Sequence, residues 1–211
     1  MPGLRSIYFK RPNNFVFESG DWIDISFEGK ELKGGATYSI SSSPTETDIR
    51  ITFREGLSEF KKALQSLKGG EQLLISQYGN DYDFRLKSNQ PSILIAGGVG
   101  IAPFRSMIKE MYDNNDKNKV TLIYFNQNNN FLFRTELDGW STEMPHVSIE
   151  YIVTKDINRK KRDKLFLTLV KDPNQNFYIA GPPTMVESYE HLLVDAGIQV
   201  RNIRIDSFGG Y

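Results

Sequence analysis

The chain has 211 residues, and its 26 basic side chains equal its 26 acidic ones, so the formal net charge is zero. This balance disfavours a broad nucleic-acid-binding surface, which needs a basic surplus. The absence of cysteine excludes disulfides, thiol catalysis, zinc–thiolate sites and iron–sulfur clusters on this chain. No apolar run approaches the roughly 20 residues that span a bilayer, and residues 1–12 lack the apolar core of a signal peptide. We therefore expect a soluble, cytoplasmic protein of one or two domains.

The first part of the chain, from Leu4 to about Gly79, has the pattern of half-buried strands. Apolar and polar residues alternate in D-W-I-D-I-S-F-E (residues 21–28) and in D-I-R-I-T-F-R-E (residues 48–55). Such strands bury one face, which suits an antiparallel sheet or a small barrel. One helix interrupts the pattern, with Ser58 as its candidate N-cap. Its predicted apolar face consists of Phe60, Ala63, Leu64 and Leu67.

From Pro91 onward, continuous apolar strands alternate with helical segments. The predicted strands are residues 92–97, 120–125, 147–154, 176–181 and 200–208, and the predicted helices are residues 103–112, 163–172 and 184–197. This alternation predicts a parallel sheet covered by helices on both sides. The polar stretch K-S-N-Q-P at residues 87–91 separates the two patterns. We therefore expect two domains, residues 1–88 and 89–211.

Three segments carry residue types that suit ligand binding. An apolar strand ends in G-G-V-G (residues 97–100), and Pro103 follows in the first turn of a helix; this geometry suits a phosphate, although a tight turn alone would also explain it. A second strand ends at Gly181, where Pro182 and Pro183 open a helix near the sheet edge at which open parallel sheets bind ligands. The segment A-T-Y-S-I-S-S-S-P (residues 36–44) presents an aromatic ring and a hydroxyl, with a purely structural role as the alternative.

The order of these motifs resembles the ferredoxin–NADP reductase family, which includes flavin reductases, NADH-dependent cytochrome reductases and the reductase components of oxygenases. The motifs are Y-S-x-x-S-x-P (38–44), G-x-S (56–58), G-G-x-G-x-x-P (97–103), G-P-P-x-M (181–185) and an aromatic near the C-terminus. The resemblance covers essentially the whole chain. It implies an N-terminal flavin-binding antiparallel β-barrel and a C-terminal α/β nucleotide-binding domain. The family's first barrel strand precedes the segment that starts at Leu4, so we expect an incomplete barrel.

The resemblance places the flavin contacts in the first domain and at the C-terminal end. It implies that Tyr38 flanks the flavin ring and that Ser39 presents a hydroxyl near flavin N5. Phe208 aligns with the family's C-terminal aromatic on the flavin, and Ser39 and Phe208 are the catalytic candidates. The other implied flavin contacts are Thr37, Ile40, Phe53, Arg54, Gly56, Leu57, Ser58 and Tyr211. Because residues 56–58 resemble a pyrophosphate-binding G-x-S, FAD is expected rather than FMN.

The same resemblance places the nicotinamide nucleotide on the second domain. Its implied contacts are Gly98, Val99, Gly100, Ile101, Ala102, Asn126, Gln127, Gly181, Pro182 and Met185. The neutral amides of Asn126 and Gln127 favour NADH, because they cannot balance the charge of a phosphate monoester. NADPH is the alternative, since the basic run at residues 159–162, interpreted as a solvated loop, could also bind that phosphate. His146 and His191 show no metal-ligand spacing, so no metal site is expected.

Two departures from the family pattern leave the function open. Ala36 stands where the family usually has an arginine on the flavin phosphate, so either Lys33 or Arg54 supplies that charge or flavin binding is weak. Ala180 stands where the family often has a cysteine near the nicotinamide. The leading hypothesis is a reductase that passes electrons from NAD(P)H through FAD to a ferredoxin, flavodoxin, cytochrome or oxygenase component. The alternatives are a free flavin reductase and a non-enzymatic flavin- or nucleotide-binding regulatory module.

Overall fold

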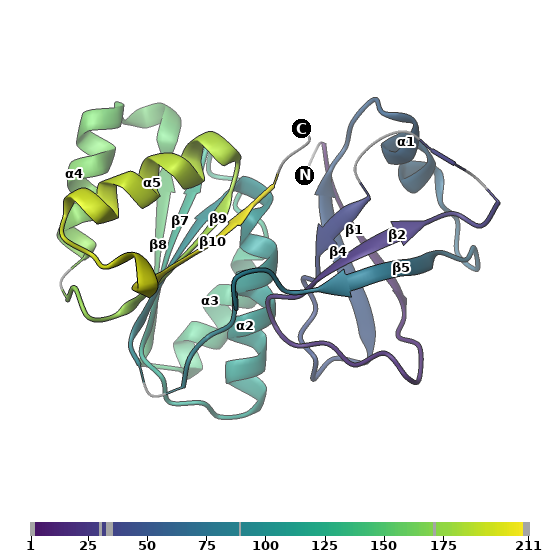
Figure 1. Ribbon diagram of the computed structural model, residues 1–211, viewed down its shortest axis with the longest axis horizontal. Coiled ribbons are helices and arrows are strands. Elements are labelled where there is room, and N and C mark those ends of the chain that lie inside the picture. Colours follow the sequence, from purple (N-terminus) through teal and green to yellow (C-terminus); the bar gives the residue numbers. More distant parts are fainter. Residues whose placement is uncertain (1–2, 30, 33–35, 89, 171, 209–211) are drawn as a thin grey trace.

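The computed structural model describes residues 3–29, 31–32, 36–88, 90–170 and 172–208, and Figure 1 shows two parts side by side. The N-terminal part contains antiparallel strands. They are β1 (Leu4–Lys10), β2 (Trp22–Ser26), β3 (Thr37–Ser39), β4 (Asp48–Arg54) and β5 (Leu74–Gly79). β1 pairs with β4, while β2 lies between β3 and β5. An antiparallel bridge between Ile40 and Ile51 connects the two small sheets.

The alternation seen in the sequence determines which side chains fill the barrel. Ile23 and Ile25 of β2, together with Ile49 and Ile51 of β4, are fully buried. The predicted helix is α1 (Glu59–Ser66), and Ser58 caps it by accepting a hydrogen bond from the backbone N–H of Lys61 at 3.2 Å. This cap satisfies one of the free donors of the first turn. The antiparallel character of this part is confirmed.

The C-terminal part is a five-stranded parallel sheet in the order β10-β9-β6-β7-β8. Its strands are β6 (Ser92–Gly97), β7 (Val120–Asn126), β8 (Val147–Val153), β9 (Asn176–Gly181) and β10 (Ile203–Ser207). Its helices are α2 (Ile101–Asp113), α3 (Arg134–Glu143), α4 (Arg159–Leu169) and α5 (Pro183–Asp195), with short 3-10 turns at Gly98–Gly100, Thr154–Asp156 and Val200–Asn202. α2 and α3 pack on one face of the sheet, and α4 and α5 pack on the other. The predicted parallel sheet covered on both sides is confirmed.

One helix was not predicted, and one local expectation was wrong. The sequence pattern does not predict α3, because Leu137 is its single fully buried side chain and, apart from Trp140, the rest of the helix is polar or glycine. The basic run at residues 159–162 is not a loop but the first turn of α4. Asn158 caps this turn by accepting a hydrogen bond from the backbone N–H of Lys161 at 2.9 Å. The structure describes no helix with the length and apolar character of a membrane span.

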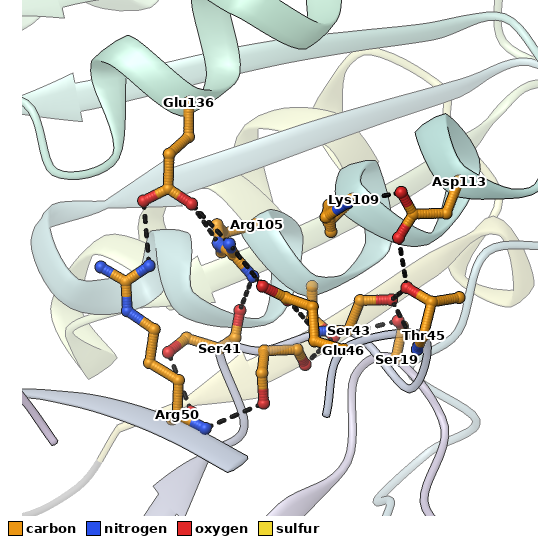
Figure 2. A network of polar contacts seen from close by, with 12 residues as sticks. Ser19, Ser41, Ser43, Thr45, Glu46, Arg50, Arg105, Lys109, Asp113 and Glu136 are labelled. Carbon is orange, nitrogen blue, oxygen red and sulfur yellow. Dashed lines mark hydrogen bonds and ion pairs between the residues drawn. The ribbon is translucent and has the colours of Figure 1, made fainter. Parts of the chain in front are cut away.

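A buried guanidinium joins the two parts of the molecule (Figure 2). Arg105 of α2 is 3% exposed. It donates to the backbone oxygen of Ser41 at 3.0 Å and forms ion pairs with Glu46 of the N-terminal part and Glu136 of α3. Glu136 also pairs with Arg50 of β4 at 2.9 Å. The charges of this cluster therefore come from both sides of the interface.

Hydroxyl contacts extend the interface along α2. Ser106 donates to the backbone oxygen of Ser42 at 2.7 Å, and its hydroxyl also lies 3.0 Å from that of Ser19. At the end of the helix, Asp113 accepts from both Thr45 and Lys109. Burial alone would lower the pKa of Arg105, but its bonds to Glu46 and Glu136 raise that pKa above the ordinary value. The guanidinium therefore stays charged.

We predict that Arg105→Met lowers the free energy of unfolding by about 3 kcal/mol, because removing one partner of a buried ion pair leaves the others uncompensated. For a chain of this size, the melting temperature would fall by about 6–12 °C. The control is Arg134→Met, which removes an exposed pair with Asp138 on α3 (49% and 50% exposed) and is expected to cost about 0.5 kcal/mol or less. Thermal unfolding of both variants measures the difference. Equal losses would contradict the assigned role of Arg105.

Candidate functional site

The first of two pockets lies where the N-terminal part meets the C-terminal sheet, and its volume is about 280 Å³. Eight of the predicted site residues line it: Thr37, Tyr38, Ser39, Phe53, Arg54, Val99, Ala102 and Phe208. Six further residues complete the lining: Trp22, Thr52, Lys61, Asp81, Asp206 and Ser207. The pocket therefore combines barrel strands, the start of α2 and the end of β10.

Aromatic side chains form much of this first pocket. The Tyr38 ring lies 5.8 Å from that of Phe53 at an interplanar angle of 62°. Burial raises the pKa of Tyr38 to about 12, so its hydroxyl stays neutral at physiological pH. The backbone N–H of Phe208 donates to the oxygen of Gly181 at 3.1 Å, which anchors the segment after β10 to the sheet. The indole N–H of Trp22 is buried and has no hydrogen-bond partner among the described residues.

A hydroxyl–carboxyl pair lies in the same pocket. Ser39 is 5% exposed, and its Oγ donates to Oδ2 of Asp206 at 3.1 Å. Burial is the main reason that the pKa of Asp206 rises to about 6; the bond from Ser39 lowers it, and the charge of Asp81 raises it. Asp206 is thus a carboxyl that exchanges its proton near physiological pH, next to the predicted catalytic hydroxyl.

The second pocket, of about 330 Å³, lies at the carboxyl ends of the parallel strands. Among the predicted residues, Arg54, Gly98, Asn126, Gln127, Pro182 and Met185 line it. Arg159 and Arg162 of α4 line it as well, together with Gly97, Phe125, Thr154, Thr184, Ser188 and Tyr189. Two arginines of the basic run thus line the same pocket as the neutral amides of Asn126 and Gln127, at the end of β7.

The glycines of the turn after β6 have different roles. Gly98 has φ +56°, and a Cβ built on it would meet nothing within 4 Å, so its missing side chain leaves open space. A Cβ on Gly100 would lie 2.2 Å from the backbone oxygen of Ala180, so this glycine allows the 3-10 turn Gly98–Gly100 to pack against β9. Tyr124 fixes the turn by donating its hydroxyl to the oxygen of Gly98 at 2.8 Å. Gly98 is therefore the position where a ligand can approach the backbone closely.

Several predicted residues do not line either pocket. Ile40 and Ile101 are fully buried, and Gly100 and Gly181 pack inside the sheet. Gly56, Leu57 and Ser58 lie between two lining residues, Arg54 and Lys61, but are not part of the lining, and Leu57 is 86% exposed. A Cβ on Gly56 would lie 2.6 Å from Cδ of Lys61, so the Lys61 side chain lies over this glycine. Tyr211 lies outside the described residues.

The family model for the oxidoreductase NAD-binding domain matches residues 94–191. A flavohemoprotein from Bacillus cereus is 24% identical over 206 residues, which cover 89% of this chain and 51% of the relative. The toluate 1,2-dioxygenase electron transfer component of Pseudomonas putida is 25% identical over 207 residues, which cover 93% of this chain and 60% of the relative. The chain thus spans little more than half the length of these curated relatives.

A solved structure extends the match to both parts of the molecule. The ferredoxin NADP+ reductase from Neisseria gonorrhoeae, with bound FAD and NADP, superposes with a TM-score of 0.81 at 19% identity, covering 98% of this chain and 93% of that one. The chain therefore has the two-part fold of a ferredoxin NADP+ reductase, and its residues 94–191 match the oxidoreductase NAD-binding domain.

The donor set of the first pocket fits a flavin such as the FAD bound in the Neisseria gonorrhoeae structure. A flavin offers ring acceptors and phosphate charge, and the pocket offers the unpaired N–H of Trp22, the hydroxyl of Ser39 and the cations Arg54 and Lys61. The sequence analysis did not identify Trp22, Lys61, Asp81 or Asp206. Asp206 gave no signal in the sequence, because β10 alternates apolar and polar residues and an aspartate at one of its polar positions is ordinary.

We predict that Asp206→Asn stabilises the flavin-free protein only where the carboxyl would be ionised. An aspartate has a pKa of about 3.9 in the unfolded chain, and in the folded chain that of Asp206 is about 6. The cost of burying its charge is therefore absent below about pH 4 and complete above about pH 6. Two pKa units correspond to about 2–3 kcal/mol.

Urea unfolding at pH 4 and pH 7.5 measures this effect. The difference in stability between Asp206→Asn and the wild type should be small at pH 4 and large at pH 7.5. Asp195→Asn, which replaces an exposed carboxylate on α5, is the control and should show no such growth. A pH-independent effect of Asp206→Asn would show that burial of its charge is not the cause.

Proposed function

We propose that this chain passes a hydride from NAD(P)H to FAD and passes the electrons on to a separate acceptor protein. The first domain, residues 1–88, would contribute most of the FAD site, and the second domain, residues 89–211, would bind the nucleotide. One observation carries the proposal: the two pockets adjoin. Arg54 lines both of them, and the consecutive residues Gly98 and Val99 each line one.

When bound, the flavin would supply the hydride acceptor, and the protein would supply alignment of the two reactants, with reacting atoms about 3–3.5 Å apart. The hydroxyl proton of Ser39 can point in either of two directions, depending on the protonation state of Asp206. With Asp206 ionised, Ser39 donates to Oδ2 of that carboxylate and leaves its lone pairs free for an N–H in the pocket. With Asp206 protonated, the carboxyl can donate to Oγ, and Ser39 can then donate to an acceptor. Ser39 can therefore accept a hydrogen bond from a protonated ring nitrogen of the flavin or donate one to an unprotonated ring nitrogen.

Phe208 would control access to the flavin from the nucleotide side. Its ring lines the first pocket, and its backbone N–H is held by Gly181, at the start of the segment that leads into α5. A nicotinamide ring could stack on the flavin only after this side chain moves aside, which makes its movement a gating step.

Lys61 offers an explanation for the missing family arginine at Ala36. Its side chain lines the first pocket and lies over Gly56, beside the G-x-S segment. Together with Arg54 it can balance the charge of a pyrophosphate, which supports FAD as the flavin. The acceptor is proposed from the relatives, because the Pseudomonas putida protein is an electron transfer component of a dioxygenase. A ferredoxin, a flavodoxin, a cytochrome or an oxygenase component would fill this role.

The visible spectrum of the purified protein tests the proposed function. We predict that the protein retains FAD and that anaerobic addition of NADH or NADPH bleaches the flavin. Retained flavin that does not bleach would support a regulatory module. Colourless protein that reduces added free flavin would support a flavin reductase that uses flavin as a substrate.

A matched pair of glycine variants separates nucleotide binding from folding in the same assay. Gly98→Val and Gly29→Val both place a Cβ at positive φ (+56° and +67°) with nothing within 4 Å, but only Gly98 lines the second pocket. We predict that Gly98→Val keeps its flavin and raises the KM for nucleotide, whereas Gly29→Val behaves as the wild type. Equal defects in both variants would point to backbone strain rather than to the nucleotide site.

The choice between NADH and NADPH is proposed from the second pocket. Nδ2 of Asn126 donates to the backbone oxygens of Asn128 at 3.1 Å and Asn130 at 2.9 Å, so this amide group is used within its own loop. Arg159 and Arg162, in contrast, line the pocket and give it positive charge. We therefore propose that NADPH is used at least as well as NADH, although the sequence alone favours NADH.

We predict that the double variant Arg159→Gln/Arg162→Gln lowers kcat/KM for NADPH about tenfold, equivalent to about 1.4 kcal/mol, and leaves that for NADH within about twofold. Lys160→Gln/Lys164→Gln is the control, because these residues lie on α4 but do not line the pocket. Steady-state kinetics with both nucleotides measures the effect. A double variant that lowers kcat/KM equally for both nucleotides would contradict the assignment. A wild type that prefers NADH tenfold would contradict it as well.

A further inference from the structure

Arg54 lies at the junction of the two pockets. It is the last residue of β4, and its side chain is exposed. It lines the 280 Å³ pocket together with Tyr38 and Lys61, and it lines the 330 Å³ pocket together with Gly98 and other residues. Its side chain makes no hydrogen bond or ion pair with any residue that the structure describes. This guanidinium is thus available to ligands on both sides.

A barrel residue therefore reaches the glycine turn of the nucleotide domain. Burial raises the pKa of the Tyr124 hydroxyl, and the positive charge of Arg54 acts on that hydroxyl in the opposite direction. The same hydroxyl donates to the oxygen of Gly98 at 2.8 Å. Arg54 is thus close enough to the Gly98 turn for its charge to be felt there.

Other cations of the site border one pocket each. Lys61 lines the first pocket and is absent from the second. Arg159 and Arg162 line the second and are absent from the first. Among the described cations that line these two pockets, Arg54 is thus the shared one. The ligands proposed for both pockets carry pyrophosphates, and two such anions in adjoining pockets repel each other unless a cation lies between them.

We propose that Arg54 binds the phosphates of both cofactors at once and thereby couples flavin binding to nucleotide binding. This inference rests on the proposed function. The first anion to bind fixes the flexible guanidinium, so the second meets a cation that is already ordered. The coupling is reciprocal, because each ligand must strengthen the other by the same factor.

Binding of ADP-ribose tests the coupling without hydride transfer. ADP-ribose carries the pyrophosphate but no nicotinamide ring, so stacking on the flavin cannot contribute. Its Kd is measured by calorimetry with flavin-free and with FAD-loaded protein. In the wild type, FAD should strengthen ADP-ribose binding about fivefold or more. In Arg54→Gln, both ligands should bind more weakly, and the ratio of the two Kd values should fall to about one or below.

Two control variants show whether this effect is specific. Lys61→Gln should weaken FAD but retain the coupling. Arg162→Gln, which removes an arginine assigned to the 2′-phosphate that ADP-ribose lacks, should leave both the affinity for ADP-ribose and the coupling unchanged. Because Arg54 has no partner among the described residues, Arg54→Gln should melt at the same temperature as the wild type. A wild type in which FAD does not change the affinity for ADP-ribose would overturn the inference, as would an Arg54→Gln variant with unchanged coupling.

The proposed function and this inference can fail separately. If FAD binds and is bleached by NAD(P)H while the two ligands bind independently, only the coupling by Arg54 is overturned. If the wild type binds no FAD, both the proposed function and the coupling are overturned.

Discussion

The buried guanidinium of Arg105 is the constraint on which the arrangement of the molecule depends. A charge that is 3% exposed is costly unless it is paired, and the carboxylates that pair with it come from both parts of the chain, Glu46 from one and Glu136 from the other. Separating the two parts would break these pairs. Arg105 belongs to the helix that begins after the glycine turn, and its partner Ser41 lies two residues after the end of β3, so the cluster connects segments that line the two pockets.

The fixed arrangement brings groups of different chemistry together from distant parts of the sequence. Ser39 meets Asp206 across 167 positions of the chain, and the end of β4 lies beside the turn after β6. Neither pocket is complete within a single domain, because the first takes Val99 and Phe208 from the C-terminal part and the second takes Arg54 from the N-terminal part. In the proposed reaction, alignment of the two cofactors would follow directly from this shared construction.

The sequence predicted the parts of the fold that depend on periodicity. Alternation identified the barrel strands, and continuous apolar runs identified the parallel sheet, because burial on one face or on two leaves a pattern in the residues. α3 was not predicted, because a helix with one fully buried side chain has almost no hydrophobic periodicity. Lys61 and Asp206 were not predicted as site residues for a different reason. Their importance comes from where their side chains lie in the folded chain, and neither the motifs nor their spacing encodes this.

A crystal structure of the protein with FAD and oxidised nucleotide is the most direct test of the central claim, which is that this domain arrangement holds two adjoining cofactor sites. The account predicts the flavin ring between Tyr38 and Phe208, the nucleotide pyrophosphate at Gly98, Arg54 in contact with the phosphates of both ligands, and the pairs of Arg105 intact. A flavin bound outside the first pocket would contradict the account. So would domains that rotate apart and break the pairs of Arg105 when both cofactors are bound.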